Sequence, residues 1–361
     1  MSKVVELTEK LVGVESVAQK PENLNRVVEI ADSFLPENLI RHRYESGGKP
    51  SLVLGFKDTK KPRVLFLAHL DVVDGKPEQF KPKIEGDRMF GRGVLDMKGP
   101  GAAAMVAFAN AAQKGLEPDA AIMLTTDEEV GSEHGVNYLV NEHGWSADFV
   151  VIPDGGNDFK LIIKGKGAFH FKAFATGVAA HGSYTWAGQN AIDKLIDFYQ
   201  ELKPIFQLRS NDPAHWHETL NIGVIRGGKK VNIVPDSAEA HFDIRFTETW
   251  SVQKVRETVE NAARKYDLKI EVESTGEPFY TRPDDQHLQE FAACVKDVLG
   301  KEPEYAHEHG ATDGRFFAQH GIPVVILYPT GGNIHGDGEW VSISGLEKLT
   351  EIFSLYLERL S

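Results

Sequence analysis

Hydrophobic residues in the first 163 positions follow two kinds of pattern. Runs such as "RVLFLAHL" (63–70) are apolar almost throughout, whereas the segments between such runs place apolar residues at helical spacing. The strand-like runs are 51–56, 63–70, 120–127 and 147–154, and the helical patterns are 3–12, 24–34 and 99–115. Continuous apolar strands separated by helices are typical of a mostly parallel sheet flanked by helices, which is an α/β fold.

The middle of the chain has a different pattern, in which apolar and polar residues alternate. This period of two is typical of half-exposed antiparallel strands, and it runs through 167–177, 218–228 and 237–248, with helical patterns at 188–207 and 251–266. The first pattern then returns, with helices expected at 286–299, 312–320 and 344–360 and a strand at 323–329. We therefore expect one α/β catalytic domain, formed by 1–163 and 278–361, with an inserted α+β domain at 164–277 that carries an antiparallel sheet.

Composition narrows the class of protein. A chain of 361 residues is longer than one hydrophobic core usually supports, which also favours two domains. The formal net charge of −13 and the lack of a Lys/Arg cluster argue against nucleic acid and anionic membranes as partners, and leave small molecules.

Cysteine content and the N-terminal sequence bear on the compartment. The single cysteine, Cys294, excludes an intramolecular disulfide, and its helical context predicts a buried apolar residue. The segment "MSKVVELTEKLVGVES" has the pattern of an amphipathic helix without the apolar region of a signal peptide, and no run approaches the length of a membrane span. These features predict a cytoplasmic protein.

Acidic and histidine side chains occur at the ends of the strand-like runs, often beside glycine. They are His69, Asp71, Asp96, Glu128, Glu129, Asp154 and His335. Ligands of open parallel sheets collect at the carboxyl ends of the strands, so we expect these side chains to meet there. Two histidines and three carboxylates can hold two zinc ions and leave a position for water.

Each of these residues also has an ordinary interpretation when it is taken alone. A lone His-x-Asp pair can be a surface pair, "TTDEEVG" can be an acidic start of a helix, and Asp96 can cap the helix that follows. However, adjacent Glu128 and Glu129 at a buried strand end are costly unless a cation compensates their charge. The sequence lacks G-x-S-x-G, H-E-x-x-H and Walker A motifs, and no G-x-G-x-x-G follows the first strand.

The order of motifs along the chain resembles the two-zinc amidohydrolase and exopeptidase family. That family includes succinyl-diaminopimelate desuccinylase, acetylornithine deacetylase, carboxypeptidase G and aminoacylase. The resemblance covers nearly the whole chain and rests on "HLDVV", "GRGVLDMKGPGAA", "TTDEEVGS", "VIPDGG", "AHGS", "NIVPDSAEAHFDIR", "ATDGRFF" and "IHGDGEWV".

The resemblance implies a role for each residue at the strand ends. His69 and Asp154 would hold one zinc, Glu129 and His335 the other, and Asp96 would bridge the two, with Glu128 as general base and Asp71 as the carboxylate that orients His69. It also implies a cis peptide bond between Asp96 and Met97.

Residues of the inserted domain and of a later loop are assigned by the same resemblance. His181 would reach the site of a neighbouring subunit and stabilise the oxyanion. Asn232 and Arg245 match binders of a substrate carboxylate, although Arg245 could instead be the partner of a structural ion pair. Gly310 and Arg315 match the loop that shapes the specificity pocket, although Arg315 could instead be an exposed arginine at the start of a helix.

The implied activity is cleavage of the amide bond of N-acyl amino acids by a metal-dependent amidohydrolase. A water bridging two zinc ions per subunit would attack, with Co²⁺ or Mn²⁺ as possible substitutes. The inserted domain, 164–277, would act as a lid and as the interface of a homodimer. A dipeptidase or carboxypeptidase of the same family is the alternative, because Asp154 stands where desuccinylases and acetylornithine deacetylases have glutamate and where aminoacylase-like and dipeptidase-like members have aspartate. A binding protein that kept the fold without catalysis is a more remote alternative.

Overall fold

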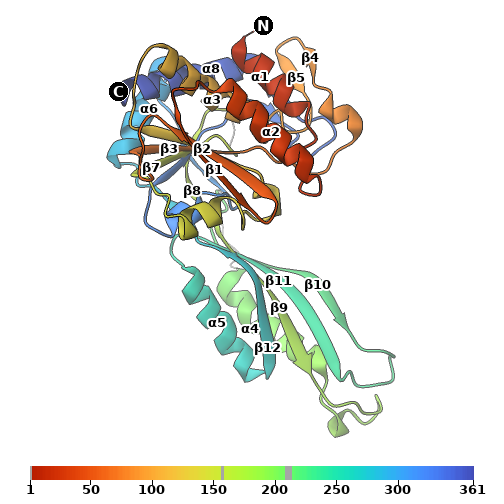
Figure 1. Cartoon of the computed structure of the whole chain (residues 1–361). Coiled ribbons are helices and arrows are strands. Elements are labelled where there is room, and N and C mark those ends of the chain that lie inside the picture. The colour runs from red at the N-terminus through yellow and green to blue at the C-terminus, as the bar shows by residue number, and fades with distance from the viewer. Residues whose placement is uncertain (1, 156–157, 208–213) are drawn as a thin grey trace. The chain divides into compact units, whose positions relative to one another are not determined.

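The computed structural model describes residues 2–155, 158–207 and 214–361, which form two compact units. Unit 1 comprises Met1–Ile163, Tyr280–Glu308 and Thr312–Ser361, and unit 2 comprises Lys164–Phe279 and His309–Ala311. Figure 1 shows the helices and strands of both units. The role predicted for the inserted segment, as a lid and dimerisation domain, stays a prediction.

A nine-stranded mixed sheet runs through unit 1. Its order is β1-β2-β6-β3-β7-β15-β8-β13, with β14 also paired to β8. The strands are β1 (Ile40–Ser46), β2 (Lys49–Gly55), β3 (Val64–His69), β6 (Ala120–Thr125), β7 (Phe149–Ile152), β8 (Leu161–Gly165), β13 (Phe279–Tyr280), β14 (Tyr305–Glu308) and β15 (Val324–Ile326). Parallel pairing joins the four strands β6, β3, β7 and β15 at the centre, and β1, β2 and β8 pair antiparallel to their neighbours. The predicted parallel sheet is therefore the middle of a mixed one.

Burial explains why the central strands read as apolar runs. Every residue of β3 and of β6 is buried, so both faces of these strands contact the protein interior, where apolar side chains are favoured. By contrast, β1 ("IRHRYES") lies at the edge of the sheet, has no buried residue, and was not predicted. Gly47 and Gly48 join β1 to β2, and both adopt the left-handed conformation that a two-residue hairpin turn requires.

Helices of unit 1 pack on the sheet and on one another. They are α1 (Lys3–Val12), α2 (Pro21–Phe34), α3 (Lys98–Gln113), α6 (Gln286–Leu299), α7 (Arg315–Ala318) and α8 (Ile343–Arg359). Helix α3, rich in alanine and glycine, is buried on nearly all sides and contacts α1 and α8. Cys294 on α6 is fully buried, as predicted. Helix α7 is shorter than the predicted 312–320.

Short elements complete unit 1 around the ends of the central strands. A second, four-stranded sheet has the order β16-β17-β5-β4, formed by β16 (Gly331–Gly332), β17 (Trp340–Ser342), β5 (Arg88–Phe90) and β4 (Lys83–Glu85). Single turns of helix occur at η1 (Pro77–Phe80), η2 (Glu128–Val130) and η3 (Tyr138–Glu142).

Unit 2 is an antiparallel sheet with two helices on one face. The sheet has the order β10-β11-β9-β12, formed by β10 (Thr219–Gly227), β11 (Ser237–Phe246), β9 (Gly167–Thr176) and β12 (Leu268–Gly276). Alternate residues of β9 and β11 are buried against α4 (Ala191–Phe206) and α5 (Val252–Lys265), which matches the period of two in the sequence. A short turn of helix, η4 (Thr185–Ala187), precedes α4, and β12 was not predicted.

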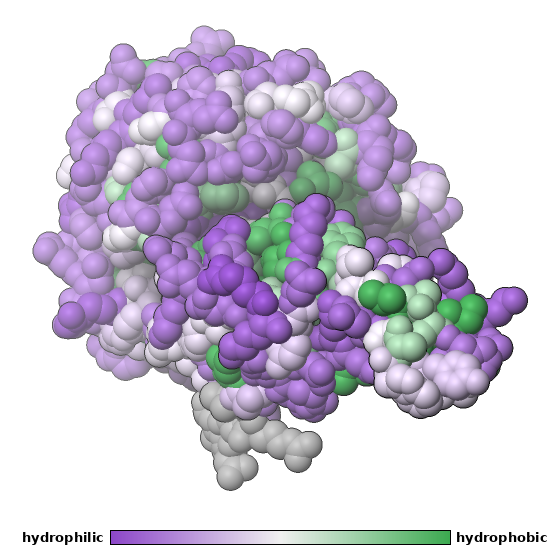
Figure 2. Space-filling model, turned by 90° about the horizontal axis from the view of Figure 1, so that it is seen from below, coloured by the Kyte–Doolittle hydropathy of each residue, from purple (hydrophilic) through white to green (hydrophobic). Residues whose placement is uncertain are grey.

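The surface is mostly hydrophilic, as the share of charged residues in the sequence leads one to expect. Hydrophilic residues cover most of the face seen in Figure 2, and hydrophobic residues gather there in a few small groups. Among the described residues, no helix combines the length and the apolar character that crossing a bilayer would need.

Candidate metal centre

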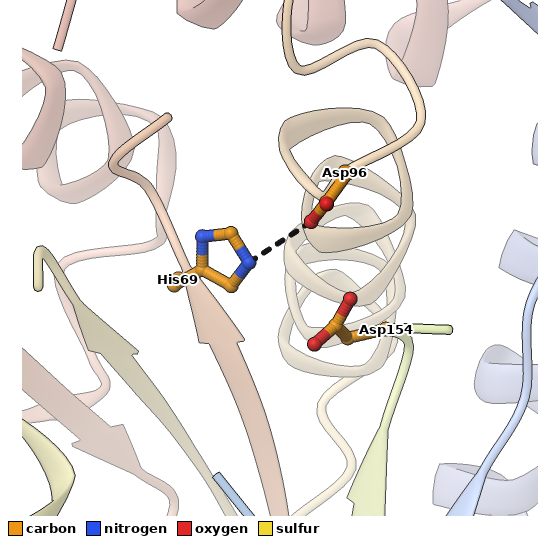
Figure 3. A group of neighbouring side chains, drawn as sticks. All are labelled: His69, Asp96 and Asp154. Atoms are coloured by element: carbon orange, nitrogen blue, oxygen red, sulfur yellow. Dashed lines mark hydrogen bonds and ion pairs between the residues drawn. The ribbon is translucent and has the colours of Figure 1, made fainter. Parts of the chain in front are cut away.

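Acidic and histidine side chains from five places in unit 1 meet where the central strands end. His69 is the last residue of β3, Asp154 follows β7, and Glu128 and Glu129 lie in η2, after β6. Asp96 lies in the loop before α3, and the predicted cis peptide bond between Asp96 and Met97 is present. Figure 3 shows His69, Asp96 and Asp154 around one point, with a dashed line joining His69 to Asp96.

Asp96 faces two histidines. Its Oδ1 lies 3.1 Å from Nε2 of His69, and its Oδ2 lies 3.1 Å from Nε2 of His335. The same Nε2 of His335 lies 3.4 Å from Oε1 of Glu129. Two groups of possible ligand atoms result, His69 with Asp96 and Asp154, and Asp96 with Glu129 and His335, and the atoms of each group lie within 4.8 Å of one another. The arrangement brings together the five residues predicted as ligands, with Asp96 in both groups.

Asp71 lies behind this cluster and is fully buried. Nδ1 of His69 lies 3.1 Å from the backbone oxygen of Asp71 and 3.6 Å from its carboxylate Oδ1. The carboxylate also accepts hydrogen bonds from the backbone N–H groups of Glu128 (3.2 Å) and Glu129 (3.0 Å). One buried side chain therefore fixes both the imidazole and the turn that carries the two glutamates.

Burial and mutual repulsion raise the pKa values of several acids in the cluster. Burial, and next the charge of Asp96, raise the pKa of Asp154 to about 8. Burial likewise raises the pKa of Glu129, and it raises that of Glu128 well above its usual range with help from Asp313. Asp96 is the exception, because hydrogen bonds from His335 and His69 outweigh its burial and lower its pKa. The cluster thus holds more negative charge than its protein surroundings neutralise.

The donor set fits a pair of divalent metal ions. Oε1 of Glu129 is buried and makes no hydrogen bond to any of the described residues, so it is an oxygen left for a ligand. Each group offers three nitrogen or oxygen atoms, which suits zinc with one open position for water or substrate. Cations there would also compensate the repulsion that raises the pKa values of the acids.

A buried ion pair that the sequence prediction missed supports two of the loops that carry predicted metal ligands. Glu339 accepts hydrogen bonds from Arg92 (2.8 Å) and from three backbone N–H groups, those of Gly93 (3.1 Å), Leu95 (3.0 Å) and Asp96 (3.1 Å). Arg92 also donates to the backbone oxygen of His335 at 2.9 Å. The pair therefore ties the Asp96 loop to the His335 loop. The only sequence signal for it was an acid beside the apolar run in "GDGEWV".

Arg315 already has polar partners in unit 1. Its Nη2 donates to the backbone oxygen of Gly131 at 3.1 Å and lies 3.9 Å from the carboxylate of Asp313, which is buried and hydrogen-bonded to Ser132. The arginine therefore contacts the loop that follows Glu128, and its side chain is only 14% exposed.

Unit 2 brings His181 and Asn232 together at its surface. His181 forms a β-bridge with Ile233, and Gly182 donates to the backbone oxygen of Asn232 at 2.8 Å. Nδ1 of His181 accepts from the backbone N–H of Ser183 at 3.2 Å, so the neutral ring carries its proton on Nε2. Both His181 and Asn232 are exposed.

The two other predicted residues of unit 2 are Arg245 and Gly310. Arg245 is on the face of β11 that the helices leave uncovered, where its Nε donates to Asp243 at 2.8 Å and its Nη2 lies 3.2 Å from Nε2 of His170. Gly310 is exposed in the short segment grouped with unit 2. The ordinary interpretation of Arg245 as an ion-pair partner thus describes its contacts within unit 2.

Comparison with known proteins gives one family. A family model described as "Peptidase family M20/M25/M40" matches residues 65–359. A curated succinyl-diaminopimelate desuccinylase of Rickettsia bellii is 26% identical over 378 aligned residues, which cover 96% of this chain and 94% of that protein.

Solved structures share the fold. The M20 family metallo-carboxypeptidase Sso-CP2 of Sulfolobus solfataricus superimposes with a TM-score of 0.79 at 20% identity, over 100% of this chain and 99% of that one. The YXEP protein of Bacillus subtilis, described as a dinuclear metal-binding peptidase of the M20 family, gives a TM-score of 0.66 at 15% identity, over 99% of this chain and 97% of that one.

Proposed function

This chain belongs to peptidase family M20/M25/M40 and is a hydrolase of amide or peptide bonds, and we propose that it removes the acyl group from N-acyl amino acids with two zinc ions per subunit. The observation that carries the proposal is the position of Asp96, whose two oxygens each lie 3.1 Å from a histidine of a different ligand group. A single carboxylate between two such groups is the arrangement that a two-metal site needs.

In this proposal each metal has its own protein ligands. His69 and Asp154 would hold one ion, Glu129 and His335 would hold the other, and Asp96 would serve both. Bound zinc would polarise the scissile carbonyl and acidify the attacking water. Asp71 holds the His69 imidazole and the turn of the glutamates in position, and Arg92 with Glu339 does the same for the loops of Asp96 and His335.

Glu128 is the proposed general base. It takes the proton of the attacking water and gives it to the nitrogen of the leaving amine. Two contacts support this role. The backbone N–H of Glu128 donates to the carboxylate of Asp71, and Arg315 donates to the backbone oxygen of Gly131 after the turn. Without metal, its surroundings raise the pKa of Glu128, burial first and the charge of Asp313 next.

The other predicted site residues are proposed to act on the substrate. The exposed Nε2–H of His181 suits a donor to the oxyanion that forms at the attacked carbonyl. Asn232 and Arg245, with Gly310 and Arg315, are proposed to bind the substrate carboxylate and to shape the pocket. For Arg245 and Arg315 this requires that a substrate oxygen join or replace the present partners Asp243 and Gly131.

We propose that the protein is a cytoplasmic homodimer and that unit 2 forms the interface. Trp186 and Val231, the most exposed of the large hydrophobic side chains in the described residues, both lie in unit 2 and support this placement. Analytical ultracentrifugation of the wild type and of Trp186→Ser tests it, since a wild type that sediments as a monomer would contradict it.

A dipeptidase or carboxypeptidase is the second candidate, and Asp154 favours it over a desuccinylase. Aspartate stands at this position in aminoacylase-like and dipeptidase-like members of the family that the sequence resembles, whereas desuccinylases and acetylornithine deacetylases have glutamate. The similarity to the Rickettsia desuccinylase, over nearly the whole of both proteins, favours the first candidate.

A substrate screen separates the candidates. Purified protein loaded with Zn²⁺, Co²⁺ or Mn²⁺ is assayed with N-succinyl amino acids, N-acetyl amino acids and dipeptides that have a free α-amino group. Faster hydrolysis of the acylated substrates supports the deacylase, and faster hydrolysis of the dipeptides supports the peptidase. Hydrolysis of none of them, by protein that holds two metals, would contradict both.

A further inference from the structure

The turn that carries Glu128 and Glu129 ends at Ser132 in a left-handed conformation. The N–H of Gly131 donates to the backbone oxygen of Glu128 at 2.9 Å. The N–H of Ser132 donates to the backbone oxygen of Asp127 at 2.8 Å, which closes the turn. Ser132 has a φ of 65°, which residues other than glycine rarely adopt. Such a conformation persists where the surrounding contacts fix it, so the contacts of Ser132 matter for the whole turn.

Two residues from a distant segment of the chain hold this end of the turn. The hydroxyl of Ser132 donates to Oδ1 of Asp313, which lies 181 residues further along the chain, and both residues are buried. Nη2 of Arg315 donates to the backbone oxygen of Gly131 at 3.1 Å. The same nitrogen lies 3.5 Å from the hydroxyl of Ser132 and 3.9 Å from the carboxylate of Asp313. These four residues all belong to unit 1, so the contacts lie within one compact unit.

The carboxylate of Asp313 has no other polar partner in the part of the chain that the structure describes. It belongs to neither group of possible metal ligands. A buried carboxylate is costly unless hydrogen bonds and an opposite charge compensate it, and here Ser132 supplies the hydrogen bond and Arg315 the charge. The place of Asp313 in the fold is therefore explained by its contact with the end of the turn.

The side chain of Glu128 depends on this turn for its position. Its carboxylate makes no hydrogen bond or ion pair with any of the described residues, whereas Oε1 of Glu129 faces Nε2 of His335 at 3.4 Å. What fixes Glu128 is the backbone that carries it. Asp71 accepts a hydrogen bond from the N–H of Glu128 at the start of the turn, and Asp313 accepts one from the side chain at its end.

We propose that Asp313 is a positioning residue for Glu128, which acts through its hydrogen bond with Ser132 by holding the end of the turn. The inference rests on the proposed function of Glu128 as general base. A base must lie within hydrogen-bond reach of the water that it deprotonates, and a displacement of about 1 Å can lower the rate by about 10²-fold. Asp71 and Asp313, at the two ends of the turn, together keep Glu128 within that reach.

The test is the turnover of full-length, zinc-loaded Ser132→Gly and Asp313→Ala on the best substrate of the screen. Glycine adopts the left-handed conformation without strain, so Ser132→Gly removes the hydroxyl and leaves the backbone free to keep its path. We expect both variants to lower kcat by about 10–100-fold with two metals still bound, and Ser132→Gly to leave KM unchanged. Asp313→Asn should lose less than Asp313→Ala, because its amide oxygen can still accept from Ser132.

Ser342→Ala is the matched control for stability. Its hydroxyl also donates to a carboxylate, that of Asp87 at 2.7 Å, and it accepts from the N–H of Gly345 at the start of α8. Loss of this cap should lower the melting temperature while kcat stays at the wild-type value. If Ser342→Ala lowers kcat as much as Ser132→Gly does, the loss reflects stability and the inference is wrong.

Combination with Glu128→Gln separates this inference from the proposed function. Because Asp313 acts on the reaction through Glu128, adding Ser132→Gly to Glu128→Gln should lower kcat no further. If Glu128→Gln is nearly inactive and Ser132→Gly turns over like the wild type, or lowers kcat equally in both backgrounds, the inference is wrong and the proposed base stands. If Glu128→Gln itself keeps wild-type turnover, the proposed base is wrong and the inference falls with it.

Discussion

The two regions proposed to act on substrate are built in different ways. In unit 1 the proposed ligands are backed by buried partners, since Asp71 contacts His69 and both glutamates, and Glu339 receives hydrogen bonds from the loop of Asp96. In unit 2, His181 and Asn232 are exposed and are held by local contacts, which are a β-bridge and hydrogen bonds from Gly182, Ser183 and Tyr184. Substitutions of the proposed ligands and their buried partners in the first region should therefore change metal affinity along with turnover, whereas substitutions in the second region should change turnover alone.

Glu128→Gln should give the largest effect and tests whether turnover can be separated from metal binding within the first region. The amide keeps the shape of the side chain but cannot take the proton, and because Glu128 is proposed to act twice we expect kcat to fall by about 10⁴-fold. Metal content, measured by atomic spectroscopy, should stay at the wild-type level. Near wild-type turnover in the metal-loaded variant would show that Glu128 is not the base.

His181→Ala tests the second region. Loss of a donor to the oxyanion should lower kcat by about 10²–10³-fold. Because His181 is exposed and lies in unit 2, zinc affinity and the melting temperature should equal those of the wild type. A variant that loses zinc, or that unfolds at a lower temperature, would contradict the contrast between the two regions.

Glu339→Gln tests the support of the loops that carry Asp96 and His335 without replacing a proposed ligand. The amide nitrogen cannot accept the hydrogen bonds that now converge on the carboxylate, so the loops of Asp96 and His335 should loosen. We expect zinc affinity to fall by about 10–100-fold. Asp87→Asn is the control, because Asp87 makes a comparable set of bonds to Ser342 and Ser344, outside the metal loops. Equal zinc affinities in Glu339→Gln and Asp87→Asn would contradict the supporting role of Glu339.

Removal of metal should make the stability of the protein fall as the pH rises from 5 to 7, the smallest effect of the four. Hydrogen bonds to Asp71 and Asp96 outweigh burial and raise the pKa of His69 well above its usual value, and burial raises that of Asp154 to about 8. Both groups therefore hold protons in the folded state that the unfolded chain has released by pH 7, so the free energy of unfolding falls across this range.

Calorimetry of chelator-treated and zinc-loaded protein measures this difference. The melting temperature of the metal-free protein should fall by roughly 2–4 °C for each kcal/mol lost. Zinc displaces the bound protons, so the loaded protein should melt at a higher temperature and should not show the fall. A metal-free protein that is more stable at pH 7 than at pH 5 would mean that the charges in the cluster are compensated by the chain itself.

Several elements could be predicted because their burial repeats along the chain. The boundaries of α1 and α6 are those predicted, since each buries a regular stripe of apolar side chains. The edge strand β1 was missed because it buries no residue and therefore carries no apolar pattern. Strand β12 was also missed, although Leu268, Ile270 and Val272 alternate with charged residues and are half-buried against the core of unit 2.

The site could be predicted for a related reason. His69, Glu129 and Asp154 follow apolar runs that form parallel strands, and parallel strands bring their carboxyl ends together. Asp96 and His335 lie in loops, and their place beside these residues was implied by the resemblance alone. Glu339 gave no such signal, because it acts through its position beside the N–H groups of Gly93, Leu95 and Asp96.

By itself the sequence determined the residue types of the candidate metal centre and the central strands beside it, because apolar runs and polar ends are properties of each segment. The tertiary structure decided which oxygen of Asp96 faces which histidine, and that Asp71 contacts two segments at once. These outcomes depend on strand register and on buried contacts between segments up to hundreds of residues apart, such as Arg92 with Glu339. No periodicity within a single segment records such contacts.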